Sequence, residues 1–453
     1  MAEAIRHDKT SRQLRMLSDA LDSGRLGPVR RLVNTLSPAE IGNLLESLPP
    51  AKRAVVWGLV DPEDDGEVLV HVGDEVRESL LADMDPDEII AAVEDLDIDD
   101  LADLVEDLPD TVIDEVLKSM DRENRDRLEQ VLSYPEDTAG RLMNPDVVTV
   151  RADTTVDVVL RFLRLRGELP EHTDHLYVVS RRRQLLGWVA LQNLVTHHPN
   201  TPISHLIDDS LTALRVDESA ESVARQFSDH DWVSAPVVDS TNELLGRITI
   251  DDVVDIIREQ AEHQALGAAG LDEDEDLFSP IRRAVRGRVV WLGINLATAF
   301  LAAFVIGRFE ATIEQIVALA VLMPIVAGIG GNAAVQVLTL MVRGLALGQV
   351  GASNASILLW KELRVALING LLIGGLVGAV AWIWFGDGLL SAVITTALVI
   401  NFCSAALAGT LVPLLMKRMN IDPAVAGTVV VTAVTDVMGF FSFLGLATVI
   451  LMR

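Results

Sequence analysis

The C-terminal part of the sequence contains five long apolar stretches, and these restrict the fold more than any other feature. A helix needs about 20 apolar residues to cross a bilayer, and the five stretches lie at about 289–306, 316–341, 365–385, 389–416 and 423–452. Because no water satisfies backbone groups in the hydrocarbon core, such a segment must be helical. The sequence therefore predicts an all-α membrane domain with five helices over 281–453.

Charge separates this apolar part from the rest of the chain. Residues 281–453 carry 11 Lys and Arg against 6 Asp and Glu, whereas residues 1–280 carry 26 against 60, so net charges of +5 and −34 make up the total of −29. The first residues are charged and lack the apolar core of a secretory signal, so we expect residues 1–280 to stay in the cytosol. Their acidity disfavours nucleic acid as a partner. The single cysteine, Cys403, excludes a disulfide framework.

Basic residues indicate how the stretches cross the membrane, because cytoplasmic loops carry an excess of Lys and Arg. They gather before the first stretch, between the second and third, and between the fourth and fifth: Arg282, Arg283, Arg286, Arg288, Arg343, Lys361, Arg364, Lys417 and Arg418. We therefore expect a multi-pass protein of the bacterial inner (plasma) membrane, with a cytoplasmic N terminus and an extracytoplasmic C terminus.

One acid, Asp436, interrupts the last apolar stretch. A charge at mid-bilayer costs roughly 2.5–3.5 kcal/mol on insertion scales, so it needs a watery path or a partner. Thr428, Thr432 and Asp436 are four residues apart and share one face of a helix. No Lys or Arg lies in 423–452. This polar stripe of three residues favours a path for a cation. The alternative is that Asp436 is a structural acid, hydrogen-bonded within a helix bundle.

The second apolar stretch contains the segment MPIVAGIGGNAAVQ. Pro324 lacks a backbone donor and can kink a helix, and broken helices with freed carbonyls form ion sites in transporters. Asn332 and Gln336 stand four residues apart on one face. The segment predicts a second polar lining of the path, and a glycine packing face is the alternative. In the fourth stretch, we expect Asn401 to hydrogen-bond between helices.

The polar groups of these stretches are oxygen donors, which narrows the choice of cation. The stripe that ends at Asp436 has no Cys or His, which disfavours zinc and copper. Mg²⁺ gives up its waters reluctantly and is usually held by one or two carboxylates. A sparse oxygen site therefore ranks Mg²⁺ first and leaves other divalent ions, such as Co²⁺ and Mn²⁺, as alternatives.

Two segments of the acidic part repeat each other, 176–195 and 234–254, each with a β-branched run, a turn and a short strand before a helix. Strand and helix patterns upstream of each segment match as well. Together they resemble a tandem pair of CBS domains over about 139–260. Such pairs form α/β modules.

The second copy carries Gly246, Thr249 and Asp252 at the spacing of the pattern with which CBS domains bind adenine nucleotides. The first copy departs from it, with Ala190 and Asn193 at the matching positions. The resemblance implies that a nucleotide such as ATP, if bound, uses Thr249 and Asp252.

In the region before the pair, segments 37–50 and 97–110 share one pattern: an acid, apolar residues at helical spacing and a Glu-x-Leu-Pro end. This pattern predicts short capped helices that form a small helical superhelix. Within 83–110 there are 13 Asp and Glu and no Lys or Arg. Packed against another acidic domain, such a face would separate unless cations intervened. A solvated acidic surface is the alternative.

The order of these parts, with Pro324, the Gly330-Gly331-Asn332 run and the final Asp436, resembles the MgtE family of magnesium channels and transporters. The resemblance implies a multi-domain membrane protein. Its expected parts are an acidic helical N domain (1–135), two CBS domains (136–200 and 201–252), a connecting or plug helix (253–280) and a five-helix transmembrane domain (281–453).

The resemblance also implies a homodimer in the lipid bilayer, with a pore on the two-fold axis. Asp436 then matches the central pore carboxylate, Thr432 contributes a backbone carbonyl, Thr428 lies on the same stripe and Asn332 belongs to the glycine-rich pore motif. Cytosolic Mg²⁺ would bind between the N domain, the CBS pair and the plug helix and close the gate. The acids implied in that regulation are Asp422, Asp252, Asp255, Glu259, Glu262, Asp95 and Asp99.

We therefore expect a Mg²⁺ channel or transporter that takes up magnesium and is gated by cytosolic Mg²⁺. A membrane-anchored CBS sensor that moves no ion is the alternative from another class. An enzyme is not expected, because the sequence shows no nucleophile with a base, no His-based metal triad and no phosphate-binding loop.

Overall fold

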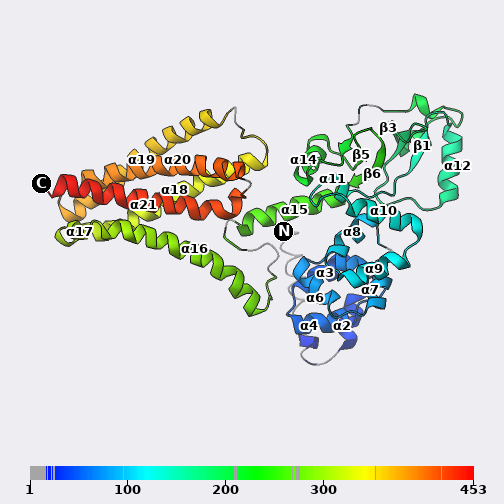
Figure 1. Ribbon diagram of the computed structural model, residues 1–453, viewed down its shortest axis with the longest axis horizontal. Helices are drawn as coiled ribbons and strands as arrows, with labels where there is room; N and C mark the ends of the chain where they lie inside the picture. The colour runs from blue at the N-terminus through cyan, green and yellow to red at the C-terminus, as the bar shows by residue number, and fades with distance from the viewer. Residues whose placement is uncertain are drawn as a thin grey trace. The chain divides into compact units, whose positions relative to one another are not determined.

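The computed structural model describes residues 17–452 except 18, 22, 24–25, 95, 209, 211, 268, 272–275, 352–353 and 420. The chain forms two compact units (Figure 1). The first unit comprises Met1–Gln260 with Asp274–Ser279, and the second comprises Ala261–Glu273 with Pro280–Arg453. Each unit is described by itself.

The first unit begins with short helices, as the capping pattern predicts. Ser37 and Glu40 form a capping box at the start of one helix, and Asp85 and Glu88 form another; such boxes satisfy backbone N–H groups that the first turn leaves free. The helices are α2 (Leu26–Val33), α3 (Pro38–Glu46), α4 (Pro50–Trp57), α5 (Asp65–Val70), α6 (Asp74–Leu81), α7 (Pro86–Val93), α8 (Ile98–Glu106), α9 (Asp110–Ser119) and α10 (Arg122–Leu132).

The repeat predicted from the sequence forms two similar three-stranded sheets. In each sheet the middle strand pairs parallel with the first strand and antiparallel with the third. After α11 (Ala139–Leu142), the first copy contains β1 (Thr149–Arg151), α12 (Val156–Arg166), β2 (His175–Val179), β3 (Leu185–Ala190) and α13 (Leu191–Thr196). After the 3₁₀ turn η1 (Ile203–His205), the second contains β4 (Leu214–Arg215), α14 (Ala220–His230), β5 (Ser234–Val238) and β6 (Leu244–Thr249).

The apolar core of the first unit fixes the N-terminal helices to the second copy. One continuous cluster runs from helical residues such as Leu101 and Leu128 to Phe227 and Ile248 of the second copy, whereas the first copy has its own cluster around Leu176. Burial of this apolar surface holds α8 and α10 in place beside the sheets.

The connecting segment expected at 253–280 contains one helix and a stretch of irregular backbone. Helix α15 spans Ile250–Gly267, and of the expected segment 253–280 the described residues after Gly267 form turns and irregular backbone. Gly270 adopts a left-handed φ of 71°, and Leu271 N–H donates to Leu266 O at 3.0 Å. A left-handed glycine is a common way to end a helix, because it lets the chain reverse and satisfy terminal carbonyls.

The second unit contains five helices long and apolar enough to cross a membrane, among the described residues. They are α16 (Ile281–Gly307), α18 (Ala318–Ala346), α19 (Ala355–Phe385), α20 (Gly388–Arg418) and α21 (Pro423–Leu451), with the short α17 (Glu310–Gln315) before α18. Several extend beyond the apolar ranges, since flanking Arg, Lys and Ala residues are good helix formers. Helix α20 packs against α18, α19 and α21, and α16 packs against α21.

Candidate ion path and regulatory acids

Helix α21 places the predicted polar stripe in the middle of the membrane unit. Asp436 is partly exposed, and Thr432 and Thr428 lie one and two turns before it with partly exposed side chains. Thr432 Oγ1 donates to Thr428 O at 2.8 Å, and Thr435 Oγ1 donates to Thr432 O at 2.9 Å. The hydroxyls of Thr432 and Thr435 are thus satisfied by their own helix, and the carboxylate is the charged group of the stripe.

Helix α18 approaches this stripe at Gly331. A methyl group built on Gly331 would come within 3.7 Å of Thr432 of α21. Asn332, the next residue, is exposed. Helix α18 continues through Pro324 without interruption, so the helix is not broken at that residue. The proline ring removes one backbone donor, yet packing against α20 and α21 keeps the helix continuous.

Asn401 joins three membrane helices, as the sequence predicted for an interhelical residue. It is fully buried on α20, and its Nδ2 donates to Val326 O of α18 at 3.0 Å. A methyl group on Gly330 of α18 or on Gly439 of α21 would collide with its amide. Small residues allow this close approach, and the amide satisfies a polar contact where no water is available.

The predicted acid at the start of α21, Asp422, caps that helix and also binds the end of α15. Its Oδ1 accepts from Ala424 N at 2.7 Å, and its Oδ2 lies 2.5 Å from His263 Nε2. Gly267 lies against Val425, so α15 ends beside the first turn of α21. The sequence analysis missed His263, although it stands four residues after Glu259 on the same helical face.

In the first unit, acids of α8 and α15 come within electrostatic reach of one another. We call these residues the acidic cluster: Asp97, Asp99, Asp100 and Asp103 at α8, with Asp251, Asp252, Asp255 and Glu259 on α15. The sequence predicted Asp99, Asp252, Asp255 and Glu259 but not Asp100 or Asp103. Spacing within an acidic run cannot select the face that a distant helix will meet.

Burial and mutual repulsion raise the pKa values of several carboxyl groups in the acidic cluster. Burial, with repulsion from Asp97, raises the pKa of Asp100 from 3.8 to about 7, and burial with repulsion from Asp251 raises the pKa of Asp252 to about 7. Burial and Asp103 raise the pKa of Glu259 to about 7. Protons or cations therefore stabilise this face at neutral pH.

Asp99 shows most directly how burial and neighbouring acids act within the acidic cluster. Burial, together with Asp252, raises its pKa well above the usual value, and its Oδ1 is buried without a hydrogen-bond partner. A buried carboxylate oxygen without a partner is costly, and carboxylate oxygens are the donors that Mg²⁺ prefers. The donor set therefore fits a hydrated divalent cation.

The remaining predicted residues are not gathered at one point. Among the described residues, no three His, Cys, Asp or Glu side chains converge closely enough to form a metal site. Glu262 is exposed on α15 in the second unit, and Asp95 lies outside the described residues. An ion that keeps its water shell can bridge carboxylates that lie too far apart to coordinate it directly.

The predicted nucleotide motif is occupied by its own hydrogen bonds. Thr249 Oγ1 donates to Asp251, and Thr249 N and Oγ1 both lie 3.1 Å from Asp252 Oδ2. The two residues thus cap the start of α15. A nucleotide would have to compete with these contacts.

Comparisons with known proteins identify the same types of domain in this chain. Three family models match: a divalent cation transporter, MgtE (323–446), the MgtE intracellular N domain (36–137) and the CBS domain (139–200 and 203–259). The magnesium transporter MgtE of Thermus thermophilus is 32% identical over 96% of this chain and 98% of its own length. That of Bacillus subtilis is 26% identical over 94% and 95%. A crystal structure of the cytosolic domain of the Mg²⁺ channel MgtE in complex with ATP is 32% identical, covers 53% of this chain and 98% of its own, and has a TM-score of 0.49.

Short helices and a CBS pair joined to five helices long enough to span a membrane match the parts of a divalent cation transporter. The full-length match at 32% identity fixes the family. The chain belongs to the MgtE family.

Proposed function

We propose that this chain is a magnesium channel or transporter and that Mg²⁺ passes beside Asp436. The observation that carries the proposal is the single carboxylate on the partly exposed stripe of α21, beside which Gly331 of α18 lies. Relatives that align over nearly their whole length are named magnesium transporters. A lone carboxylate at mid-membrane is costly unless it meets water or a cation.

In the proposed path, Asp436 holds a hydrated Mg²⁺ by charge rather than by stripping its water. The oxygens of Thr428 and Thr432 and the amide of Asn332 would accept or donate hydrogen bonds to that water shell. In a homodimer with the stripe on the two-fold axis, two copies of Asp436 would share one ion and neutralise it. The partly exposed stripe in the single chain supports such a second copy.

Flux into liposomes tests the path. Purified protein with Asp436→Asn should lose Mg²⁺ flux by at least about tenfold, because an interaction with a charged group is worth about 1.5–3 kcal/mol. Asp387→Asn is the matched control: Asp387 caps α20 by accepting from Leu389 N at 2.8 Å, and Asn caps a helix equally well. Equal flux in both variants and the parent protein would place the path elsewhere. Competition by Mn²⁺ and Co²⁺ in the same assay measures selectivity.

We further propose that cytosolic Mg²⁺ regulates this flux through the acidic cluster. Mg²⁺ between α8 and α15 would neutralise carboxylates whose repulsion otherwise favours separation. A ligand that binds only the joined arrangement stabilises it by RT ln(1 + [L]/Kd) per site. Several weak sites together can shift a gate by a few kcal/mol. Helix α15 carries the signal, since its end contacts α21 through His263 and Asp422.

The proposed setting is the bacterial inner membrane, with the first unit in the cytoplasm and the C terminus outside. The basic residues at the ends of the apolar helices support this orientation. Cysteine accessibility tests it in a variant whose native Cys403 is replaced. A single cysteine at Met452 should react with an impermeant reagent from outside intact cells, whereas one at Arg418 should not.

A further inference from the structure

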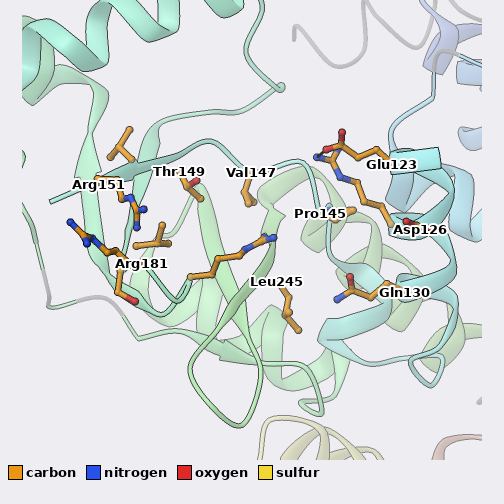
Figure 2. Close-up of a pocket in the computed structure, with 14 residues that line it drawn as sticks. Glu123, Asp126, Gln130, Pro145, Val147, Thr149, Arg151, Arg181 and Leu245 are labelled. Atoms are coloured by element: carbon orange, nitrogen blue, oxygen red, sulfur yellow. Dashed lines mark hydrogen bonds and ion pairs between the residues drawn. The ribbon is translucent and has the colours of Figure 1, made fainter. Parts of the chain in front are cut away.

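A pocket of about 610 Å³ lies in the first unit between α10 and the first CBS copy (Figure 2). Its walls come from α10, from β1 and the residues before it, from the turn between β2 and β3, and from the start of β6. Pockets that hold small molecules in proteins commonly have about 300–1,000 Å³. The proposed transport function does not use this pocket.

The lining is cationic in a strongly acidic part of the chain. Four arginines face two acids there. Arg127 Nη2 lies 2.7 Å from Glu123 Oε1, and Arg183 lies 3.9 Å from an acid outside the pocket. Arg151 and Arg181 have no acidic partner among the described residues, and Figure 2 shows them beside each other on one wall. Two adjacent guanidinium groups without counter-charge indicate an anion site.

The second CBS copy provides an internal comparison for Arg151. The matching residue at the end of β4, Arg215, pairs with Asp217 two residues later, with Nε 3.2 Å from Oδ1. Asp153 stands at the same position after Arg151, yet no such pair forms. Arg151 therefore lines the pocket although a local acid is available.

The turn beside Arg151, between β2 and β3, also differs in charge from the matching turn of the second copy. Both turns have one conformation, with φ of 59° at Arg183 and 63° at Asn242. The second copy fills its turn with Ser-Thr-Asn after Asp239, whereas the first fills it with three arginines after Ser180. Asn adopts a left-handed φ readily and Arg rarely does. The conformation of the turn therefore does not explain why arginines stand there.

We propose that this pocket binds a phosphomonoester whose body carries hydroxyl groups, that is, a sugar phosphate or a nucleoside monophosphate. Arg151 and Arg181 would hold the phosphate, because guanidinium groups match its oxygens in paired hydrogen bonds. Figure 2 shows Glu123, Asp126 and Gln130 on the opposite wall. These groups accept hydrogen bonds from hydroxyls and disfavour a ligand that is anionic along its whole length.

The pocket is separate from the nucleotide motif of the second copy. Leu245, which lines the pocket, stands at the start of β6, and Thr249 stands at its end. Four residues of extended strand correspond to about 13 Å. Variants can therefore distinguish the two sites.

Calorimetry on the full-length protein in nanodiscs tests the proposal with ribose 5-phosphate, AMP, inorganic phosphate and ribose as probes. We expect saturable binding of ribose 5-phosphate or AMP that Arg181→Ser weakens about tenfold or more, as the loss of a charge-assisted hydrogen bond predicts. Serine is the residue at the matching position of the second copy. Arg182→Ser is the matched control, since it removes the same charge from the same turn outside the pocket lining.

The outcomes separate the ligand sources and the competing explanations. Binding of ribose 5-phosphate alone identifies a sugar phosphate, and binding of AMP that survives Thr249→Ala identifies a mononucleotide. The proposal fails if neither ester binds, if inorganic phosphate or ribose binds equally well, or if Arg181→Ser and Arg182→Ser weaken binding alike. It also fails if Thr249→Ala abolishes binding while Arg181→Ser does not. Unchanged thermal unfolding of each variant in buffer shows that the fold is intact.

Discussion

The raised pKa values of Asp100, Asp252 and Glu259 predict that α8 and α15 separate as pH rises when Mg²⁺ is absent. Asp100 titrates at about 7 in the folded protein against 3.8 when free. Between these values the folded state binds more protons than the unfolded state, so the free energy of unfolding falls as pH rises. The stabilisation is complete below about pH 4 and is lost as pH passes through about 7.

The size of the effect follows from the pKa shift of Asp100. One pKa unit corresponds to about 1.4 kcal/mol, so a shift of about three units would be about 4 kcal/mol for an isolated group. Asp100 is half-buried, and solvent screening reduces the contribution to about 1–2 kcal/mol. Asp100→Asn removes the charge at nearly constant shape, so it should make the joined arrangement more stable at pH 8 by that amount.

Hydrogen exchange of the α8 amides in the full-length protein measures this change. In Mg²⁺-free buffer, after correction for the intrinsic exchange rate, protection of α8 should fall between pH 5.5 and 8. Asp100→Asn should reduce the fall, and Mg²⁺ at pH 8 should restore protection in the parent protein. Asp87→Asn, at an exposed acid of α7, is the matched control. Protection that is independent of pH, or an equal gain from Asp87→Asn, would refute the electrostatic reasoning.

Two further predictions concern packing. Arg53→Ala should destabilise the first unit by about 3–5 kcal/mol, because Arg53 Nη2 lies 2.6 Å from Asp276 Oδ2 and both side chains are buried. Thermal unfolding measures this loss of stability. The double variant with Asp276→Ala should lose less stability than the sum of the two single variants. Gly330→Ala should destabilise the membrane unit by about 1–3 kcal/mol, because its methyl group would collide with the amide of Asn401. Gly328→Ala meets nothing within 4 Å and should be neutral or slightly stabilising in the same detergent melt; equal effects of the two changes would contradict the packing argument.

Local patterns in the sequence were sufficient to predict the membrane helices, the repeat and the polar stripe. Apolar runs long enough to span a bilayer have one stable backbone form, and the four-residue spacing of Thr428, Thr432 and Asp436 fixes their common face once the helix exists. The matching turns of the repeat likewise follow from nearby residues. The particular ion-binding roles of these residues stay predictions.

Other features depend on which distant segments meet, and the sequence alone did not reveal them. The continuity of α18 through Pro324 reflects packing beyond local propensity. Asp100 joined the acidic cluster because the apolar core holds α8 beside α15.

The sequence by itself determined where this chain crosses a membrane and which lone carboxylate the crossing contains, because hydrophobic length and helical spacing act within one segment. Only the tertiary structure decided which charges face each other. The pKa of Asp100 and the place of Arg151 in the pocket lining depend on neighbours far apart in the chain. Electrostatic energies depend on distance in space and on burial, and neither can be read from residue order.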